Sequence, residues 1–308
     1  MRALKNHARS IADPWNAVTV DIAEVVRLFG LGELVSAPEP VAGGLSNELW
    51  RATTTEGTFA VKRMLTNASA TGFVSNIEAA YAIEARCVAA GVPMPEPIPY
   101  AGRALARVSG DVVRVHTWTD GTTPRSCDGA VELLAQIHAA GAPRLAGRSP
   151  GWKAVGWPED VVALARVVDT GPDQRVEVDS HRDLNRKNTL RRADGVLVAL
   201  DWDAAGPTSA VQDAVAVALD WTDDIDGFRT AIALYEHASG IEIPAEPWVF
   251  AGWVGAQGGW LDHVAATGNA TETADTLARL SAVARDLPLL VGAVAEEGDA
   301  GVEGLGFG

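Results

Sequence analysis

The chain is poor in cysteine and lacks any long apolar run. Its 308 residues include only two cysteines, Cys87 and Cys127, which are too few for a disulfide framework or a cysteine zinc site. No stretch of about eighteen consecutive apolar residues occurs, and residues 1–16 contain no apolar run of signal-peptide length. We therefore expect a cytoplasmic protein with reduced cysteines.

Basic residues are also scarce. The chain has 25 Lys and Arg against 40 Asp and Glu, which gives a formal net charge of -15. Such a field repels nucleic-acid backbones and anionic membrane surfaces, so we expect neither as a partner. A neutral or cationic partner fits better, although many acidic proteins bind no charged ligand. With 47% hydrophobic residues, the chain can bury a core large enough for two domains or one bilobal unit.

The first hundred residues predict a sheet and one long helix. A short helix is expected at residues 21–29, and residues 41–64 form strands joined by a glycine loop and by the turn Glu56-Gly57. Residues 76–90 are rich in alanine, contain no proline and are followed by Gly91. This pattern is typical of a helix that ends on a glycine, and the prolines beyond it indicate an extended linker.

A β-rich run at residues 111–117 marks the boundary between two lobes. Beyond it, apolar residues at helical spacing over 128–140 predict the opening helix of a mainly helical lobe. We therefore divide the chain into an amino-terminal lobe at 1–117 and a carboxy-terminal lobe at 118–295. Residues 296–308 are rich in glycine and acidic residues, and we expect a disordered tail there.

The segment from His181 to Asn188 carries the clearest chemical signal. It reads His-Arg-Asp-Leu-Asn-Arg-Lys-Asn, which matches the kinase catalytic-loop pattern H-R-D-L-x-x-x-N at every fixed position. Phosphoryl transfer needs a carboxylate that orients the attacking hydroxyl and accepts its proton, and an amide oxygen that holds magnesium. Asp183 and Asn188 supply these groups. The alternative, a charged solvated turn, would rarely reproduce the whole pattern by chance.

A hairpin is expected directly after this loop. Strand-forming residues flank the turn Ala193-Asp194-Gly195, and the second strand ends at Asp201. Because a hairpin returns its end to its start, Asp201 would lie beside the catalytic loop. There its carboxylate can link magnesium to nucleotide phosphates. Asp203 is either a second ligand or a cap for the following turn.

Lys62 completes the set of kinase-like residues. It ends the strand Phe59-Ala60-Val61-Lys62, as the phosphate-binding lysine of a V-A-I-K strand does. Its glutamate partner should come from the helix at 76–90, where we favour Glu84 over Glu78.

These elements and their order resemble the aminoglycoside phosphotransferase family and its choline-kinase-like relatives, from about residue 41 to residue 221. The segments that carry the resemblance are Gly43 to Asn47, Ala60 to Arg63, Glu84, Gly91 to Pro95, Leu134 to His138, His181 to Asn188 and Leu200 to Asp203. Position 182 departs from the family, since many members have glycine where this chain has Arg182.

The resemblance implies an α+β, bilobal, protein-kinase-like fold with a β-sheet nucleotide-binding lobe and a mainly helical catalytic and substrate-binding lobe. It implies transfer of the γ-phosphate of ATP, with Mg²⁺, to a hydroxyl of an aminoglycoside, amino sugar or related metabolite. Asp183 would be the catalytic base, helped by Lys62 and Glu84, and Asn188 and Asp201 would hold the metal. A nucleotide-binding pseudokinase without turnover is the alternative.

Nucleotide contacts and the acceptor site are less sharply marked. The loop residues Gly43, Gly44 and Ser46 would cover the phosphates, and by the resemblance the adenine would meet backbone at Arg114, Val115 and His116. The acceptor would bind in the carboxy-terminal lobe, where carboxylates and indoles suit a neutral or cationic ligand. The candidates are Asp203, Asp220, Asp223, Asp224, Trp253 and Trp260. The alternative for each is a solvated acidic loop or a core tryptophan.

Overall fold

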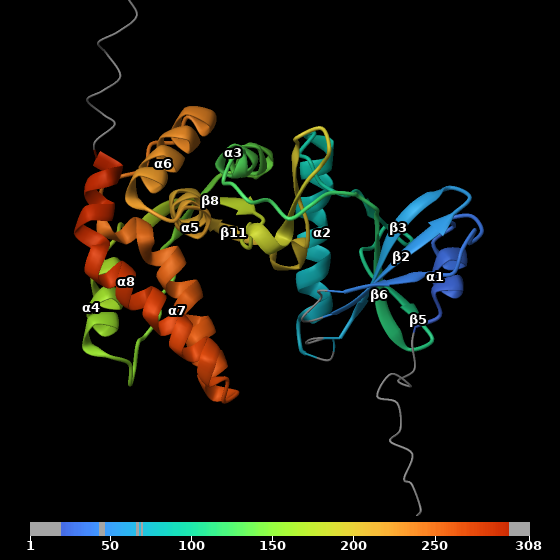
Figure 1. Cartoon of the computed structure of the whole chain (residues 1–308), viewed down its shortest axis with the longest axis horizontal. Helices are drawn as coiled ribbons and strands as arrows, with labels where there is room; N and C mark the ends of the chain where they lie inside the picture. Colours follow the sequence, from blue (N-terminus) through green and yellow to red (C-terminus); the bar gives the residue numbers. More distant parts are fainter. Residues whose placement is uncertain (1–19, 43–46, 66–67, 69, 296–308) are drawn as a thin grey trace, which may run out of the picture. The chain divides into compact units, whose positions relative to one another are not determined.

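The computed structural model describes residues 20–42, 47–65, 68 and 70–295, which divide into two compact units (Figure 1). One unit contains the chain up to Val74 together with Pro97–Trp118, and the other contains Ser75–Glu96 and the chain from Thr119. The first is built on an antiparallel sheet and the second is mainly helical, so the predicted fold class is confirmed. The units differ from the sequence-based division at Ser75–Glu96, and the expected tail at 296–308 lies outside the described residues.

The described residues of unit 1 form an antiparallel sheet and the helix α1. Its elements are α1 (Ile22–Leu28), β1 (Glu39–Val41), β2 (Asn47–Thr54), β3 (Gly57–Met64), β4 (Pro97–Ile98), β5 (Ala106–Val108) and β6 (Asp111–Thr117). The strand order is β1-β2-β3-β6-β4, and β5 also pairs with β6. The predicted hairpin of β2 and β3 is confirmed, with Thr54 paired to Gly57 across its turn.

The alternation of side chains along β3 decides where Lys62 lies. Phe59 and Val61 are buried in the core of unit 1 with Val25 and Val26 of α1. Because successive side chains of a strand point to opposite faces, Lys62 lies on the other face of the sheet.

Unit 2 contains the remaining elements. They are α2 (Phe73–Ala89), α3 (Ala130–Ala140), β7 (Arg144–Gly147), α4 (Glu159–Val168), β8 (Gln174–Ser180), η1 (Arg186–Asn188), β9 (Thr189–Arg191), β10 (Leu197–Ala199), η2 (Trp202–Ala204), β11 (Gly206–Ser209), α5 (Ala210–Trp221), α6 (Ile225–Ser239), η3 (Pro247–Phe250), α7 (Ala251–Ala266) and α8 (Ala270–Ala295). The 3-10 helices are labelled η. Among the described residues, no helix is both long enough and apolar enough to cross a bilayer.

The core of unit 2 explains why α2 belongs to it. Ala80, Ile83 and Cys87 recur at helical spacing on α2 and pack into one cluster with Leu134 and Ile137 of α3. Burial raises the pKa of the Cys87 thiol to about 11, so this cysteine is a small apolar core residue at neutral pH. Helix α2 is therefore fixed by the helical unit although it precedes three strands of the sheet in sequence.

Two small β structures hold the catalytic loop. Strand β8 leads into residues 181–188 and pairs with β7 on one side and β11 on the other. Strands β9 and β10 form the predicted hairpin, with Thr189 opposite Ala199. The loop is therefore held at both of its ends by strand pairing.

Two tryptophans fix the segment before α4 to helix α7. The indole N–H groups of Trp152 and Trp157 each donate to one carboxylate oxygen of Asp262, both at 2.8 Å. Gly258 makes room for this contact, because a Cβ there would lie 2.0 Å from the Trp152 ring. The contact between Trp152 and α7 therefore requires glycine at position 258.

Candidate active site

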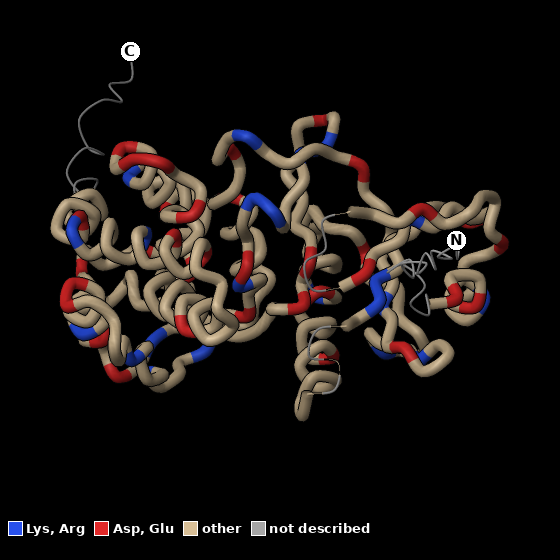
Figure 2. Tube along the Cα trace, turned by 60° about the horizontal axis from the view of Figure 1, so that its bottom comes forward, with Lys and Arg blue, Asp and Glu red and all other residues tan. Residues whose placement is uncertain are grey.

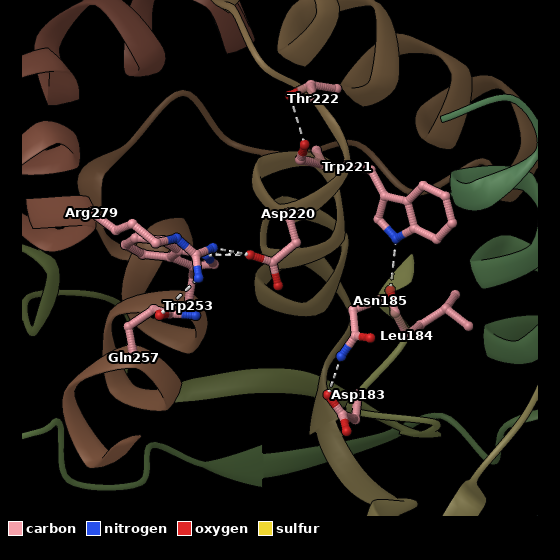
Figure 3. Close-up of polar contacts among 10 residues, drawn as sticks. Asp183, Leu184, Asn185, Asp220, Trp221, Thr222, Trp253, Gln257 and Arg279 are labelled. Atoms are coloured by element: carbon pink, nitrogen blue, oxygen red, sulfur yellow. Dashed lines mark hydrogen bonds and ion pairs between the residues drawn. The ribbon is translucent and has the colours of Figure 1, made fainter. Parts of the chain in front are cut away.

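Asp183 accepts hydrogen bonds from two side-chain amides of its own loop. Asn185 Nδ2 donates to Asp183 Oδ1 at 2.6 Å (Figure 3). Asn188 Nδ2 donates to Asp183 Oδ2 at 2.7 Å. The Asn188 amide also donates to the Asp183 carbonyl oxygen at 3.0 Å. Both carboxylate oxygens are therefore oriented, and Asn188 is turned so that its side-chain oxygen points away from Asp183.

Asn185 is a site residue that the sequence did not reveal. Its Oδ1 accepts the backbone N–H groups of Lys187 and Asn188 at 2.9 and 3.2 Å and so caps η1. One side chain thus both orients Asp183 and starts the turn that presents Asn188. The only sequence signal was a capping residue type at a position that the catalytic-loop pattern leaves variable.

The surroundings of Asp183 raise the pKa of its carboxyl above the ordinary value. The main cause is desolvation by neighbouring protein, and the negative charge of Asp201 acts in the same direction. His181 and the two amide hydrogen bonds oppose the shift without cancelling it. A carboxylate with a raised pKa is a stronger base, which suits a group that takes a proton from a hydroxyl.

His181 ties the catalytic loop to the hairpin. The ring is fully buried, and desolvation lowers its pKa, so the imidazole is neutral. Its Nε2 lies 2.7 Å from the Leu200 carbonyl oxygen, and its Nδ1 accepts the Asp183 N–H at 3.3 Å. These partners require the proton on Nε2. Trp202 packs edge-on against the ring, with centroids 4.7 Å apart.

The hairpin brings Asp201 beside the loop, as predicted. The Leu200 N–H donates to the Asn188 carbonyl oxygen at 2.8 Å, so Asp201 follows a residue bonded to the loop itself. Asp201 has a left-handed backbone, with φ of 56°. Asp203 lies in η2 and is half-buried. Asp183, Asn188 and Asp201 are thus gathered within unit 2.

The backbone at position 182, where many members of the family have glycine, is left-handed. Arg182 has φ of 64°, a conformation that glycine adopts freely and that costs other residues of order 1 kcal/mol. Its side chain runs past Gly206, where a Cβ would lie 3.0 Å from Arg182 Nη1. The chain therefore keeps the backbone conformation that glycine favours while carrying an arginine.

A buried polar network lies behind the loop. Asp213 Oδ2 accepts from Ser180 Oγ at 2.6 Å and lies 3.0 Å from His138 Nε2, and His138 Nδ1 lies 2.7 Å from the Tyr235 hydroxyl. Burial alone would raise the pKa of Asp213, but the hydrogen bonds and charge of His138, with Ser180, hold it below the ordinary value. An ionised Asp213 therefore joins α3, α5 and α6 to the last residue of β8.

Lys62 and Glu84 fall in different units. Lys62 lies in β3 opposite Arg114 of β6, whereas Glu84 lies in α2 and is fully buried. Glu78 is half-buried on the same helix. The pairing of Lys62 with Glu84 stays a prediction, and the predicted phosphate-loop residues Gly43, Gly44 and Ser46 lie outside the described residues.

The residues expected to meet the adenine, Arg114, Val115 and His116, lie in the sheet of unit 1, and their role stays a prediction. All three lie inside β6 and pair with β3, and Val115 and His116 also pair with β4 on the opposite edge. Their main chains are therefore engaged by the sheet. The strand continues to Thr117, and the Trp118 N–H still donates to the Thr58 carbonyl oxygen at 2.9 Å.

One of the proposed acceptor residues, Asp220, forms an ion pair with an arginine of the same unit. Asp220 Oδ1 accepts from Arg279 Nη2 at 2.7 Å and from Trp253 Nε1 at 3.0 Å (Figure 3). Trp253 is 3% exposed, and the Arg279 guanidinium lies 5.6 Å from its ring centre. The indole is therefore a buried support for Asp220, which differs from its predicted role as a ligand-facing ring.

The other acceptor candidates lie on the surface. Asp223 is exposed, and Asp224 caps α6 by accepting the Gly227 N–H at 2.7 Å. Trp260 is 46% exposed and donates to Glu272 at 3.1 Å. Acidic residues are spread over both units rather than gathered on one element (Figure 2). Selection of a cation would therefore depend on these few carboxylates rather than on a broad acidic face.

Comparisons with known proteins agree on the fold. An aminoglycoside phosphotransferase from Alicyclobacillus acidocaldarius shares 12% identity and a TM-score of 0.57, over 93% of this chain and 98% of that one. The macrolide 2'-phosphotransferase MphH from Brachybacterium faecium shares 16% identity and a TM-score of 0.54, over 84% and 96%. A thermostable mutant of the aminoglycoside phosphotransferase APH(4)-Ia, in complex with ADP and hygromycin B, shares 15% identity and a TM-score of 0.57, over 85% and 97%.

A search of curated protein sequences found no match. The model of the phosphotransferase enzyme family matches residues 38–245, more than half of the chain, and this range includes the catalytic loop, the hairpin and Asp201. The chain therefore belongs to the phosphotransferase enzyme family and is a small-molecule kinase.

Proposed function

We propose that this kinase transfers the γ-phosphate of ATP to a hydroxyl group of a small molecule, with Asp183 as the base. The observation that carries the proposal is the gathering of Asp183, Asn188 and Asp201 on one loop and the hairpin behind it. The raised pKa of Asp183 supports its role as base. Related folds have been crystallised with ADP, with AMP-PNP and with hygromycin B, which supports ATP as the donor.

Magnesium fits the oxygen donors of this site. Asn188 directs its amide nitrogen to Asp183 and so keeps its oxygen for another partner, and Asp201 adds a carboxylate. Among the described residues, no group of three or more His, Cys, Asp or Glu side chains converges as a metal cage. Magnesium does not need one, because it binds through one or two protein oxygens together with nucleotide phosphates. When bound, it would neutralise charge on those phosphates.

The loop residues then divide the chemistry among them. Asp183 hydrogen-bonds the acceptor hydroxyl and takes its proton as the oxygen attacks the γ-phosphorus. The new oxygen–phosphorus bond forms while the bond to the β-phosphate oxygen breaks, and ADP leaves. Asn185 and Asn188 hold the carboxylate in place, and His181 accepts the main-chain N–H of Asp183. Lys62, with Glu84 as its partner, and the loop residues Gly43, Gly44 and Ser46 would bind the phosphates, and the adenine would meet backbone beyond Thr117.

The acceptor is proposed to be neutral or cationic. Asp203, Asp223 and Asp224, with Trp260, offer carboxylates and one exposed indole in the catalytic unit. Arg279 offsets the charge of Asp220, and Arg229 pairs with Asp226 at 2.7 Å. The segment from Asp220 to Arg229 therefore carries less uncompensated negative charge than its acidic residues alone suggest. Polyhydroxylated compounds with one or few amines fit this balance.

A screen of the full chain with ATP and Mg²⁺ tests the proposal. Neutral, cationic and anionic hydroxyl compounds, hygromycin B among them, are scored for a phosphate added to the acceptor by mass spectrometry. We expect phosphorylated products among neutral or cationic compounds. Phosphorylation confined to anionic acceptors would contradict the acceptor class, and ATP binding without any transfer would favour the pseudokinase alternative.

Asp183→Asn should lower kcat about 100- to 10,000-fold and leave ATP binding nearly unchanged, because it removes the base but keeps the shape of the side chain. The control is Asp194→Asn, on the exposed turn between β9 and β10, which should retain full activity. Comparable turnover in Asp183→Asn and the parent would refute the assignment of the base.

A further inference from the structure

Helix α5 ends directly against the catalytic loop. Trp221, its last residue, is 1% exposed and donates its indole N–H to the Leu184 carbonyl oxygen at 2.8 Å (Figure 3). In return, Arg186 Nη2 donates to the Trp221 carbonyl oxygen at 2.7 Å. Two hydrogen bonds of opposite direction therefore join one helical residue to two residues of the loop.

The bond from Arg186 also satisfies the end of the helix. The last carbonyl groups of a helix have no partner within it and carry the negative end of its dipole. A guanidinium on the Trp221 carbonyl meets both requirements, and the Arg186 guanidinium lies 5.7 Å from the centre of the Trp221 ring. The contact therefore combines a hydrogen bond, a favourable charge and an aromatic face.

The two held residues flank Asn185. Asn185 orients Asp183 with its amide nitrogen and caps the turn of Asn188 with its oxygen. Because Leu184 and Arg186 are fixed on either side, Trp221 restrains the residue that places both functional groups of the loop. A shift of about 1 Å in a catalytic group can lower a rate by a factor of about 100.

We infer that Trp221 is a positioning residue for phosphoryl transfer, which acts through Leu184, Arg186 and Asn185 on Asp183. The inference rests on the proposed role of Asp183 as base. Trp221 itself is buried, and each of its two bonds with the loop joins a side-chain donor to a main-chain carbonyl, so it need not contact ATP or the acceptor. Loss of the Trp221 contact should therefore lower kcat more than it lowers the affinity for either substrate.

Trp221→Phe tests this, because it removes the indole N–H and keeps an aromatic ring. The matched control is Trp157→Phe, which removes an indole N–H bonded to Asp262 at 2.8 Å in the same unit. ADP formation is measured with an acceptor from the screen and also without acceptor, where water takes its place. We expect kcat to fall about 10- to 100-fold for Trp221→Phe, with the KM for ATP within about twofold, and to stay near the parent value for Trp157→Phe.

Hydrogen exchange supplies a second readout. The Lys187 and Asn188 amides, both bonded to Asn185, should exchange faster in Trp221→Phe and at the parent rate in Trp157→Phe. Arg186→Met removes the reciprocal bond from the loop side and should lower kcat similarly. The double variant should be little worse than either single variant, since both bonds restrain one loop. Arg186→Met decides the matter alone if Trp221→Phe does not fold.

The outcomes separate this inference from the proposed function. A kcat within twofold of the parent in Trp221→Phe or in Arg186→Met, with unchanged loop exchange, would show that the contact only packs α5 and would overturn the inference. Full activity of Asp183→Asn in the same assay would instead overturn the assignment of the base.

Discussion

Ionisation of the Asp183 carboxyl group should determine how activity depends on pH on the acid side. Its pKa is raised by desolvation and by the charge of Asp201, and only the ionised form accepts a proton. Activity should therefore rise with pH and level off above a midpoint higher than the ordinary value of about 4. The measurement is kcat/KM against pH with a non-titrating acceptor.

Asn185→Asp sharpens this prediction. The substituted oxygen can still cap η1, but the donor to Asp183 is lost and a negative charge takes its place. Both changes disfavour the ionised form of Asp183, so the midpoint should move further up. A midpoint that stays fixed or moves down would argue that the acid limb belongs to another group.

Asp201 should determine the magnesium dependence of nucleotide binding. Asp201→Asn is a suitable variant, because asparagine tolerates the left-handed backbone at φ of 56°. We expect ATP binding, titrated with and without Mg²⁺, to lose most of its response to the metal, since a carboxylate ligand is removed. Asp203→Asn is the companion variant. An equal loss there would make Asp203 a second ligand, and an unchanged response to Mg²⁺ in Asp201→Asn would refute the role of Asp201.

At the scale of elements, the Asp213 network should contribute strongly to the stability of unit 2. Removing one partner from a buried hydrogen-bonded network typically costs about 1–3 kcal/mol, because the polar groups left behind stay buried without compensation. Asp213→Ala should therefore destabilise the protein by roughly this amount in denaturant unfolding. Asp226→Ala, which breaks the exposed Asp226–Arg229 pair, should cost less than about 1 kcal/mol. Similar losses for the two variants would contradict the importance of the network.

The same network should make the folded protein less stable as the pH falls. Because the pKa of Asp213 is held below its ordinary value, its ionised form stabilises the folded state. That contribution is present above the unfolded-state pKa and is lost as the pH falls through the folded-state pKa. The parent protein should therefore lose more stability on acidification than Asp213→Ala does.

At the scale of the whole molecule, the net charge of -15 should affect cationic acceptors through their association with the enzyme. Raising the ionic strength from about 0.1 M to 1 M shortens the screening length from about 10 Å to about 3 Å. We expect kcat/KM to fall for an amine-bearing acceptor and to change little for a neutral acceptor of similar size. Equal responses of the two acceptors would show that the carboxylates near Asp220 do not select charge.

The fold and the core of the site could be predicted because their signals are local. The catalytic loop, the β9–β10 hairpin and the helix after β3 each depend on residues a few positions apart, whose spacing and turn chemistry are visible in sequence. Asp183, Asn188 and Asp201 come together through a short loop and a hairpin that returns on itself. No long-range packing had to be known to place them.

Distant contacts were decided only by the tertiary structure. Arg279 reaches Asp220 across 59 positions, His138 reaches Asp213 across 75, and Trp221 reaches Leu184 across 37. Arg114 pairs with β3, and Val115 and His116 pair with strands on both edges. Residue types and spacing determine which chemistry a segment can offer, but the packing of helices and strands from far along the chain decides which charges are offset, which rings are buried and which main-chain groups remain for a ligand.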